Sequence, residues 1–123
     1  MEALKLPKDT DVQKQIRKNA IHQAIIGSID VPLRLVEVCK IGMEYTYSIA
    51  QSSNKSVISD LGIGTILFEA AAQSALLTVE INLASLQDEA LKLQYGNQIY
   101  WLIDEIAELK MKTLRVTRDR IMQ

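Results

Sequence analysis

Hydrophobic positions recur three and four residues apart along most of this chain, which is the spacing of one face of an α-helix. No segment alternates between apolar and polar residues with a period of two, so no β-strand is predicted. The expected fold class is therefore all-α, a bundle of about four long helices with a proline bend. The helices are expected near residues 11–30, 32–51, 56–83 and 86–120.

Local signals place the boundaries of these helices. Thr10 and Gln13 form a Thr-x-x-Gln capping box where the first helix begins. Pro32 lacks a backbone N–H and disfavours helix at the residue before it, so a bend or restart is expected between the first two helices. Ser85 and Asp88 form an approximate capping box for the last helix.

The segment 54–83 is nearly continuous in apolar residues and contains no proline. A charge-poor helix of this length must be covered on most sides in water, so it is expected to be the central helix of the bundle. On a helical projection, one narrow strip is expected to face solvent and carries Glu69, Gln73 and Glu80. The opposite strip carries small and polar residues, namely Asp60, Gly64, Ala71, Ser74, Thr78 and Asn82.

Two explanations of this small and polar strip are open. It is either a close helix–helix contact or the polar wall of a ligand pocket. Asp60 and Asn82 lie about 33 Å apart along a continuous helix, at about 1.5 Å per residue, so one small pocket in one subunit cannot use both. Either the two residues serve different sites, or an antiparallel dimer brings the ends of two copies together.

Composition narrows the functional classes. The chain has 123 residues, which is the length of one domain, and its net charge of -1 gives no reason to expect binding to nucleic acid. The single cysteine, Cys39, excludes an internal disulfide and is typical of a reducing compartment. No secretory signal follows Met1, so a cytoplasmic location is expected. Acidic residues such as Asp60 and Glu69 interrupt the central segment, which favours a soluble helix over a membrane span.

Candidate chemistry among the rarer side chains is sparse. His22 is the only histidine, and there is no cysteine pair, so a zinc site is not expected. His22 is either a general base or a half-exposed helix residue. Cys39 lies on an apolar seam and is expected to be a buried, inert thiol.

Four phrases in a fixed order carry a family resemblance. They are KLPKDT at residues 5–10, VPL at 31–33, SDLG at 59–62 leading into an alanine-rich helix that ends in INL at 81–83, and the acidic pair at 88–89. Together they resemble the cyclodeaminase family, which includes the C-terminal domain of formiminotransferase-cyclodeaminase and bacterial methenyltetrahydrofolate cyclohydrolases. The resemblance covers essentially the whole chain.

The resemblance implies an all-helical, dimer-forming enzyme domain that acts on one-carbon forms of tetrahydrofolate, without a metal or prosthetic group. In the cyclodeaminase reaction the folate N10 attacks the formimino carbon and ammonia leaves; in the cyclohydrolase reaction water adds to the methenyl bridge and the ring opens. The expected roles are proton transfer by Asp60, orientation of folate nitrogens by Asn82, substrate contact by Ser59 in the SDLG phrase, and binding of the folate glutamate tail by Lys8. Tyr95, Tyr100 and Trp101 are either packing residues or a platform for the pterin ring.

The chain departs from the family pattern in two places. Family members carry a glycine-rich Pro-Gly-Gly-Gly-Ser segment and its helix ahead of the matched part, and this sequence contains no such segment. Where the family often has Asn-Val-Arg before INL, this chain has Thr78, Val79 and Glu80. Residues 1–123 are therefore expected to form one helical domain that is an incomplete cyclodeaminase-type domain. The alternative is a non-catalytic helical dimerisation module that retains only the family core.

Overall fold

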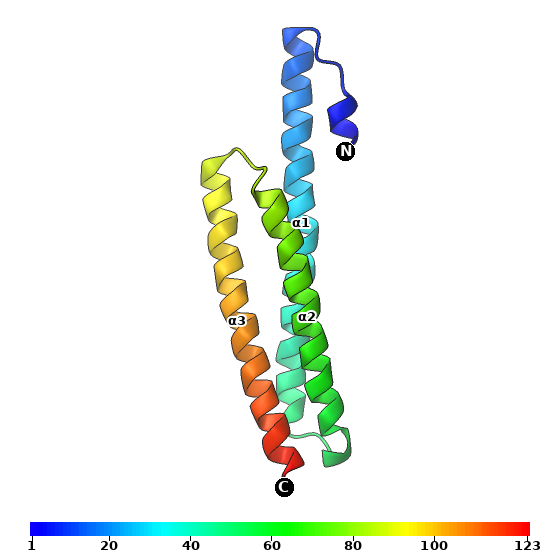
Figure 1. Cartoon of the computed structure of the whole chain (residues 1–123), viewed down its shortest axis with the longest axis vertical. Coiled ribbons are helices and arrows are strands. Elements are labelled where there is room, and N and C mark those ends of the chain that lie inside the picture. The colour runs from blue at the N-terminus through cyan, green and yellow to red at the C-terminus, as the bar shows by residue number, and fades with distance from the viewer.

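The computed structural model describes all 123 residues and contains three long α-helices (Figure 1). Helix α1 spans Asp11–Ala50, α2 spans Ile58–Leu83 and α3 spans Glu89–Ile121. Two short 3-10 turns, η1 at Glu2–Lys5 and η2 at Lys55–Val57, precede α1 and α2. There is no strand, which confirms the all-α class.

The expected division of the first half into helices at 11–30 and 32–51 is wrong, and so is the count of four. α1 is a single helix of 40 residues with Pro32 inside it, and a bend there is not confirmed. Proline at position 32 removes the backbone hydrogen bond to the carbonyl of Ser28, four residues earlier. The side-chain amide of Asn82 in α2 donates to that carbonyl at 3.4 Å, so a neighbouring helix satisfies the group that proline leaves free.

Capping explains where two of the helices begin. The Thr10 side chain accepts from the Gln13 backbone N–H, and the Gln13 side chain accepts from the Thr10 N–H, which confirms the predicted capping box. α3 begins at Glu89 rather than at 86, because Asp88 alone caps it by accepting from the Leu91 N–H at 3.1 Å.

The core lies where the three helices run side by side. Its central residues are fully buried and come from all three helices, among them Ile29, Val36, Met43, Ala72, Leu76, Val79, Leu102 and Ile106. The first buried residue of α1 is Ile29, so the N-terminal half of α1 projects beyond the core, as Figure 1 shows. This projection forms one wall of the candidate site.

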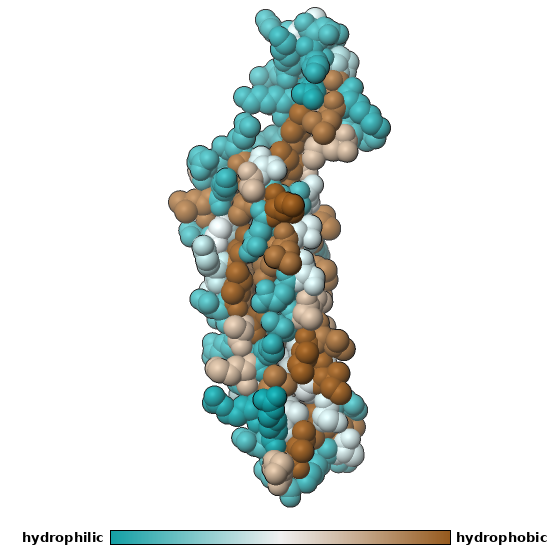
Figure 2. Space-filling model, viewed as in Figure 1, coloured by the Kyte–Doolittle hydropathy of each residue, from teal (hydrophilic) through white to brown (hydrophobic).

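Much of α2 is uncovered in spite of its hydrophobic composition. The segment Lys55–Leu83 is long and apolar enough to cross a membrane by length and composition alone, and only 33% of its most apolar window is buried. Figure 2 shows hydrophobic side chains gathered over the lower part of α2, near its N-terminal end. The expectation that this helix is covered on most sides is therefore wrong for a single chain, because one face of α2 has no partner within it.

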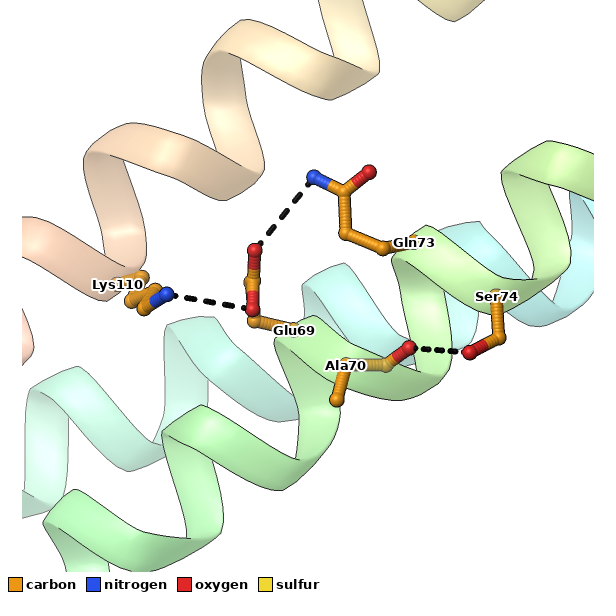
Figure 3. A network of polar contacts seen from close by, with 5 residues as sticks. All are labelled: Glu69, Ala70, Gln73, Ser74 and Lys110. Carbon is orange, nitrogen blue, oxygen red and sulfur yellow. Dashed lines mark hydrogen bonds and ion pairs between the residues drawn. The ribbon is translucent and has the colours of Figure 1, made fainter.

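The polar strips of α2 match their expected placement only in part: Gln73 and Glu80 are exposed as expected, and Glu69 is not. Glu69 is not solvent-exposed: its side chain is 19% exposed and pairs with Lys110 of α3 at 3.4 Å, with Gln73 donating to the same carboxylate (Figure 3). The small and polar strip is mostly open, since Asp60 and Thr78 among others are exposed. Apart from Asn82, which reaches α1, most of the strip is therefore left open by the other helices of the subunit.

Candidate functional site

An open cavity lies where the projecting half of α1 meets the connection between α2 and α3. Its volume is about 790 Å³, within the range of small-molecule sites. Four cationic side chains and one acidic side chain line it, namely Lys8, Lys14, Arg17, Lys18 and Asp88. The excess of positive charge favours an anionic ligand.

Helical spacing and one folded-back segment build this cavity. Lys18 lies four residues after Lys14, and Ile25 lies two helical turns (seven residues) after Lys18, so all three share one face of α1. The guanidinium of Arg17 donates to the Leu4 carbonyl at 3.3 Å, which holds the η1 segment against α1. That contact, with the Thr10 capping box, places Lys8 at the cavity.

The structure brings together some of the predicted site residues and separates others. Lys8 lines the cavity, and Asn82 lies three residues before the cavity residue Ser85. Ser59 and Asp60 are exposed at the opposite end of α2. Because α2 is continuous, about 33 Å separate Asp60 from Asn82 within one subunit.

The amide of Asn82 already has partners. Its Nδ2 donates to the carbonyl of Thr78 at 2.8 Å and to that of Ser28 at 3.4 Å. The side-chain oxygen makes no hydrogen bond and is free to accept one. Asn82 therefore joins α2 to α1 and keeps one acceptor free, but it is not among the residues that line the cavity.

His22 is half-buried and lines the cavity, so the structure places the only histidine at the candidate site. The sequence pattern did not single out Lys14, Arg17 or Lys18. The available signal was their clustering on the first turns of α1, shortly after Lys8, but such a run is also typical of a solvated helix face.

Two other candidates lie outside the cavity. Cys39 is buried, and burial raises the pKa of its thiol, as expected for an inert cysteine. Tyr95 donates a hydrogen bond to Asp30 at 2.6 Å, and Trp101 lies against the Lys40 ammonium at 4.8 Å. These aromatic residues join α3 to α1 rather than line the large cavity. No group of three His, Cys, Asp or Glu side chains is placed to hold a metal ion.

Comparison with known proteins shows which family this chain is similar to. The family described as Formiminotransferase-cyclodeaminase matches residues 1–100, which include every residue that lines the cavity. The chain belongs to this family. The match confirms the resemblance carried by the four phrases.

Individual relatives in this family are similar over most of the chain. Methenyltetrahydrofolate cyclohydrolase of Methylorubrum extorquens is 30% identical over 121 residues, which are 98% of this chain and 58% of that protein. Formimidoyltransferase-cyclodeaminase of Gallus gallus is 31% identical over 105 residues, which are 85% of this chain and 19% of that protein. The mouse protein of the same name is 30% identical over 105 residues. The chain thus spans less than two thirds of the relatives it matches.

Proposed function

We propose that this chain is a folate one-carbon enzyme domain that hydrolyses the methenyl bridge of methenyltetrahydrofolate, or catalyses the related cyclodeaminase reaction. The observation that carries the proposal is the basic cavity within the family-matched segment. The cyclohydrolase reaction is the first choice, because the relative with that name aligns with 98% of this chain.

The charges of the cavity suit the substrate of this reaction. A folate carries carboxylates on its glutamate tail, and Lys8, Lys14 and Lys18 supply positive charge on the cavity wall. Hydration of the methenyl carbon requires removal of a proton from water and protonation of the departing nitrogen. His22 lines the cavity and is a candidate for this proton transfer. We assign the acid–base role to Asp60 and contacts with the substrate to Ser59 and Asn82.

We further propose the setting in which the domain works. It is a single cyclodeaminase-type domain that acts as a homodimer in the cytoplasm on a tetrahydrofolate derivative, without a prosthetic group. Neither nucleic acid nor a membrane is a partner. The exposed face of α2 supports association, and the separation of Asp60 from the cavity supports a site that needs more than one copy.

The test is calorimetric titration of the purified chain with 5-formyltetrahydrofolate, followed by an assay of methenyltetrahydrofolate hydrolysis. We expect saturable binding, weakened about tenfold or more by the double substitution Lys14→Gln and Lys18→Gln. Arg115→Gln, which removes an exposed cation from α3 far from the cavity, is the matched control and should bind as the unmodified chain does. Equal affinity in all three proteins would contradict the role of the cavity.

The second candidate is the non-catalytic helical dimerisation module. The observation that favours it is the engagement of the Asn82 amide with Ser28, which gives this residue a structural purpose without substrate. A chain that assembles but shows no folate binding in the same titration would support this candidate against the enzyme.

A further inference from the structure

Arg17 is the cavity cation that also holds a neighbouring segment of the chain. Its Nη2 atom donates to the carbonyl of Leu4 at 3.3 Å, and η1 lies beside the projecting half of α1 (Figure 1). This distance exceeds the usual limit of about 3.2 Å for such a bond. The Nε atom of the same guanidinium is buried and has no hydrogen-bond partner. Arg17 therefore holds η1 by one long hydrogen bond and leaves a second, buried donor unpaired.

The two donors belong to one edge of the planar guanidinium. The N–H of Nε and one N–H of Nη2 point the same way, and their spacing matches the two oxygens of a carboxylate. The carbonyl of Leu4 has a single oxygen, which accepts from Nη2 and leaves Nε unpaired. Buried donors in folded proteins are nearly always paired. A carboxylate would pair both donors, at the position that the Leu4 carbonyl takes in the structure.

No carboxylate of the chain itself pairs with Arg17. The three ion pairs of the structure include no residue that lines the cavity. The one acidic side chain that lines the cavity, Asp88, accepts from the Leu91 N–H at 3.1 Å as the cap of α3. The four cavity cations therefore present unpaired positive charge, which attracts an anionic ligand.

The η1 segment can leave α1 without disturbing the core, because none of its residues is buried. The N–H of Asp9 donates to the Gln13 side chain at 3.0 Å, which anchors the chain at the start of α1. Lys8 precedes Asp9 directly and stays with it. Leu6 is extended, and together with Pro7 it connects η1 to this anchored part. Movement of η1 therefore leaves Lys8 at the cavity.

We propose that Arg17 binds a carboxylate of the cavity ligand through Nε and Nη2, and that this carboxylate displaces η1 from α1. The Leu4 carbonyl then exchanges its donor for water, whereas the buried Nε gains an acceptor. Because the carboxylate and η1 use the same edge of the guanidinium, each weakens the binding of the other by the same factor. Only the identity of the ligand, the glutamate tail of a folate, rests on the proposed function.

Alkylation of a cysteine in η1 measures this displacement. Ala3 is the only residue of η1 that is half-buried, so a cysteine in Ala3→Cys is protected while η1 lies on α1. Glutarate, a dicarboxylate with the length of the glutamate side chain, should increase the rate of alkylation by iodoacetamide severalfold. Sodium chloride at equal ionic strength is the control, because chloride cannot accept from both donors as a carboxylate does. The parent chain, whose Cys39 is buried, gives the background rate.

Arg17→Lys keeps the charge and removes the two-donor edge. We expect calorimetry to show glutarate binding weakened about tenfold or more. In the Ala3→Cys background, alkylation should be fast with and without glutarate, because lysine does not reproduce the contact with Leu4. Arg115→Lys makes the same change at an exposed position of α3 and should behave as the parent does.

Leu4→Gly tests the sign of the coupling. Glycine keeps the backbone carbonyl but favours the released segment, because it has more conformational freedom there than leucine. Competition between η1 and the carboxylate then predicts that glutarate binds about two- to fivefold more tightly. Weaker binding would show that η1 helps to hold the anion, and equal binding would show that the two are independent; both results contradict the displacement.

Slower or unchanged alkylation of Ala3→Cys in glutarate would also overturn the proposal. The measurement is repeated with 5-formyltetrahydrofolate to separate this proposal from the proposed function. Folate binding without faster alkylation contradicts the displacement and leaves the proposed function in place. Displacement by glutarate, together with no binding of the folate, contradicts the proposed function and supports Arg17 as a carboxylate-binding residue.

Discussion

Single side chains in this molecule satisfy backbone groups that the helices leave free. Asn82 illustrates this, since its amide reaches the Ser28 carbonyl that has no donor because residue 32 is proline. A buried or half-buried carbonyl without a partner costs about 1–3 kcal/mol, so the contact contributes to the continuity of α1.

A double-mutant cycle measures this coupling. Asn82→Ala should lower the free energy of unfolding by about 1 kcal/mol in the parent chain. In the background of Pro32→Ala, whose own N–H can donate to Ser28, the same change should cost less than half as much. Chemical denaturation gives both values, with Thr78→Ala, on the same strip of α2, as the control. Equal costs in the two backgrounds would show that Asn82 does not act through the Ser28 carbonyl.

The Tyr95 hydroxyl and Asp30 form a second residue-scale contact, at 2.6 Å between α3 and α1. Burial, followed by the hydrogen bond to Asp30 and its negative charge, raises the pKa of Tyr95 to about 12. The folded chain therefore holds this proton more tightly than the unfolded chain does. Its contribution to stability is complete below pH 10, the ordinary pKa of tyrosine, and is lost as the pH rises from 10 to 12.

Tyr95→Phe should remove this alkaline dependence. At neutral pH the substitution should lower the free energy of unfolding by about 0.5–1.5 kcal/mol through the lost hydrogen bond. Between pH 10 and 12 the difference between the variant and the parent should shrink, as followed by thermal melts. Tyr100→Phe, at a position that is 73% exposed, serves as the control. A difference that stays constant to pH 12 would contradict the assignment.

At the scale of elements, a side chain of α3 forms hydrogen bonds with the C-terminal end of α1. Arg120 near the end of α3 donates to the Ala50 carbonyl at 2.7 Å and to the Ser53 hydroxyl at 3.2 Å, and also to the Ser53 carbonyl. These acceptors lie at the C-terminus of α1, where the last carbonyls lack helical partners and the helix dipole favours a cation. One guanidinium thus joins the ends of the first and last helices.

Arg120→Gln should lower the free energy of unfolding by about 1–3 kcal/mol, because hydrogen bonds to a charged donor are lost from half-buried carbonyls. The matched control is Arg118→Gln, which removes an exposed cation two residues away and should be nearly neutral. Denaturant unfolding compares the two. A similar small effect of both substitutions would show that the hydrogen bonds of Arg120 do not stabilise the bundle.

At the scale of the whole molecule, the three helices bury one side of α2 and leave the other side open. Adjacent residues show the contrast: Leu76 is 2% exposed and lies in the core, whereas Leu77 is 68% exposed and lies on the open side of α2. A monomer would gain nothing from Leu77, but a dimer would bury it.

Leu76→Ala should lower the free energy of unfolding by about 2–5 kcal/mol at every protein concentration, as a core truncation does. Leu77→Ala should leave the circular dichroism spectrum intact, reduce the mass in solution and weaken the concentration dependence of Tm. Light scattering and thermal melts at two concentrations distinguish the variants. A Leu77→Ala chain with unchanged mass and Tm would place the association surface elsewhere.

The sequence by itself determined the helical class, the family and the capped start of α1 at Thr10. Helical periodicity and the Thr10–Gln13 box are local, since they depend on residues within one or two turns, and both were predicted correctly. The apolar residues of α3 follow the same helical spacing, and Ile99, Leu102, Ile106 and Leu109 are buried.

Only the tertiary structure decided what depends on a neighbouring helix. Pro32 predicts a break when α1 is considered alone, but the helix continues, and Asn82, fifty positions later, supplies a donor to the Ser28 carbonyl that proline leaves free. Glu69 was expected to face solvent from its position on the helical projection. That projection could not show that Lys110 of α3 lies beside it. The basic cavity likewise depends on the packing of η1 against α1 and on the α2–α3 connection. The sequence therefore indicated Lys8, through the family phrases, but not Lys14, Arg17 or Lys18. Local pattern determines a helix, but the surface that covers it is determined by residues distant in the chain.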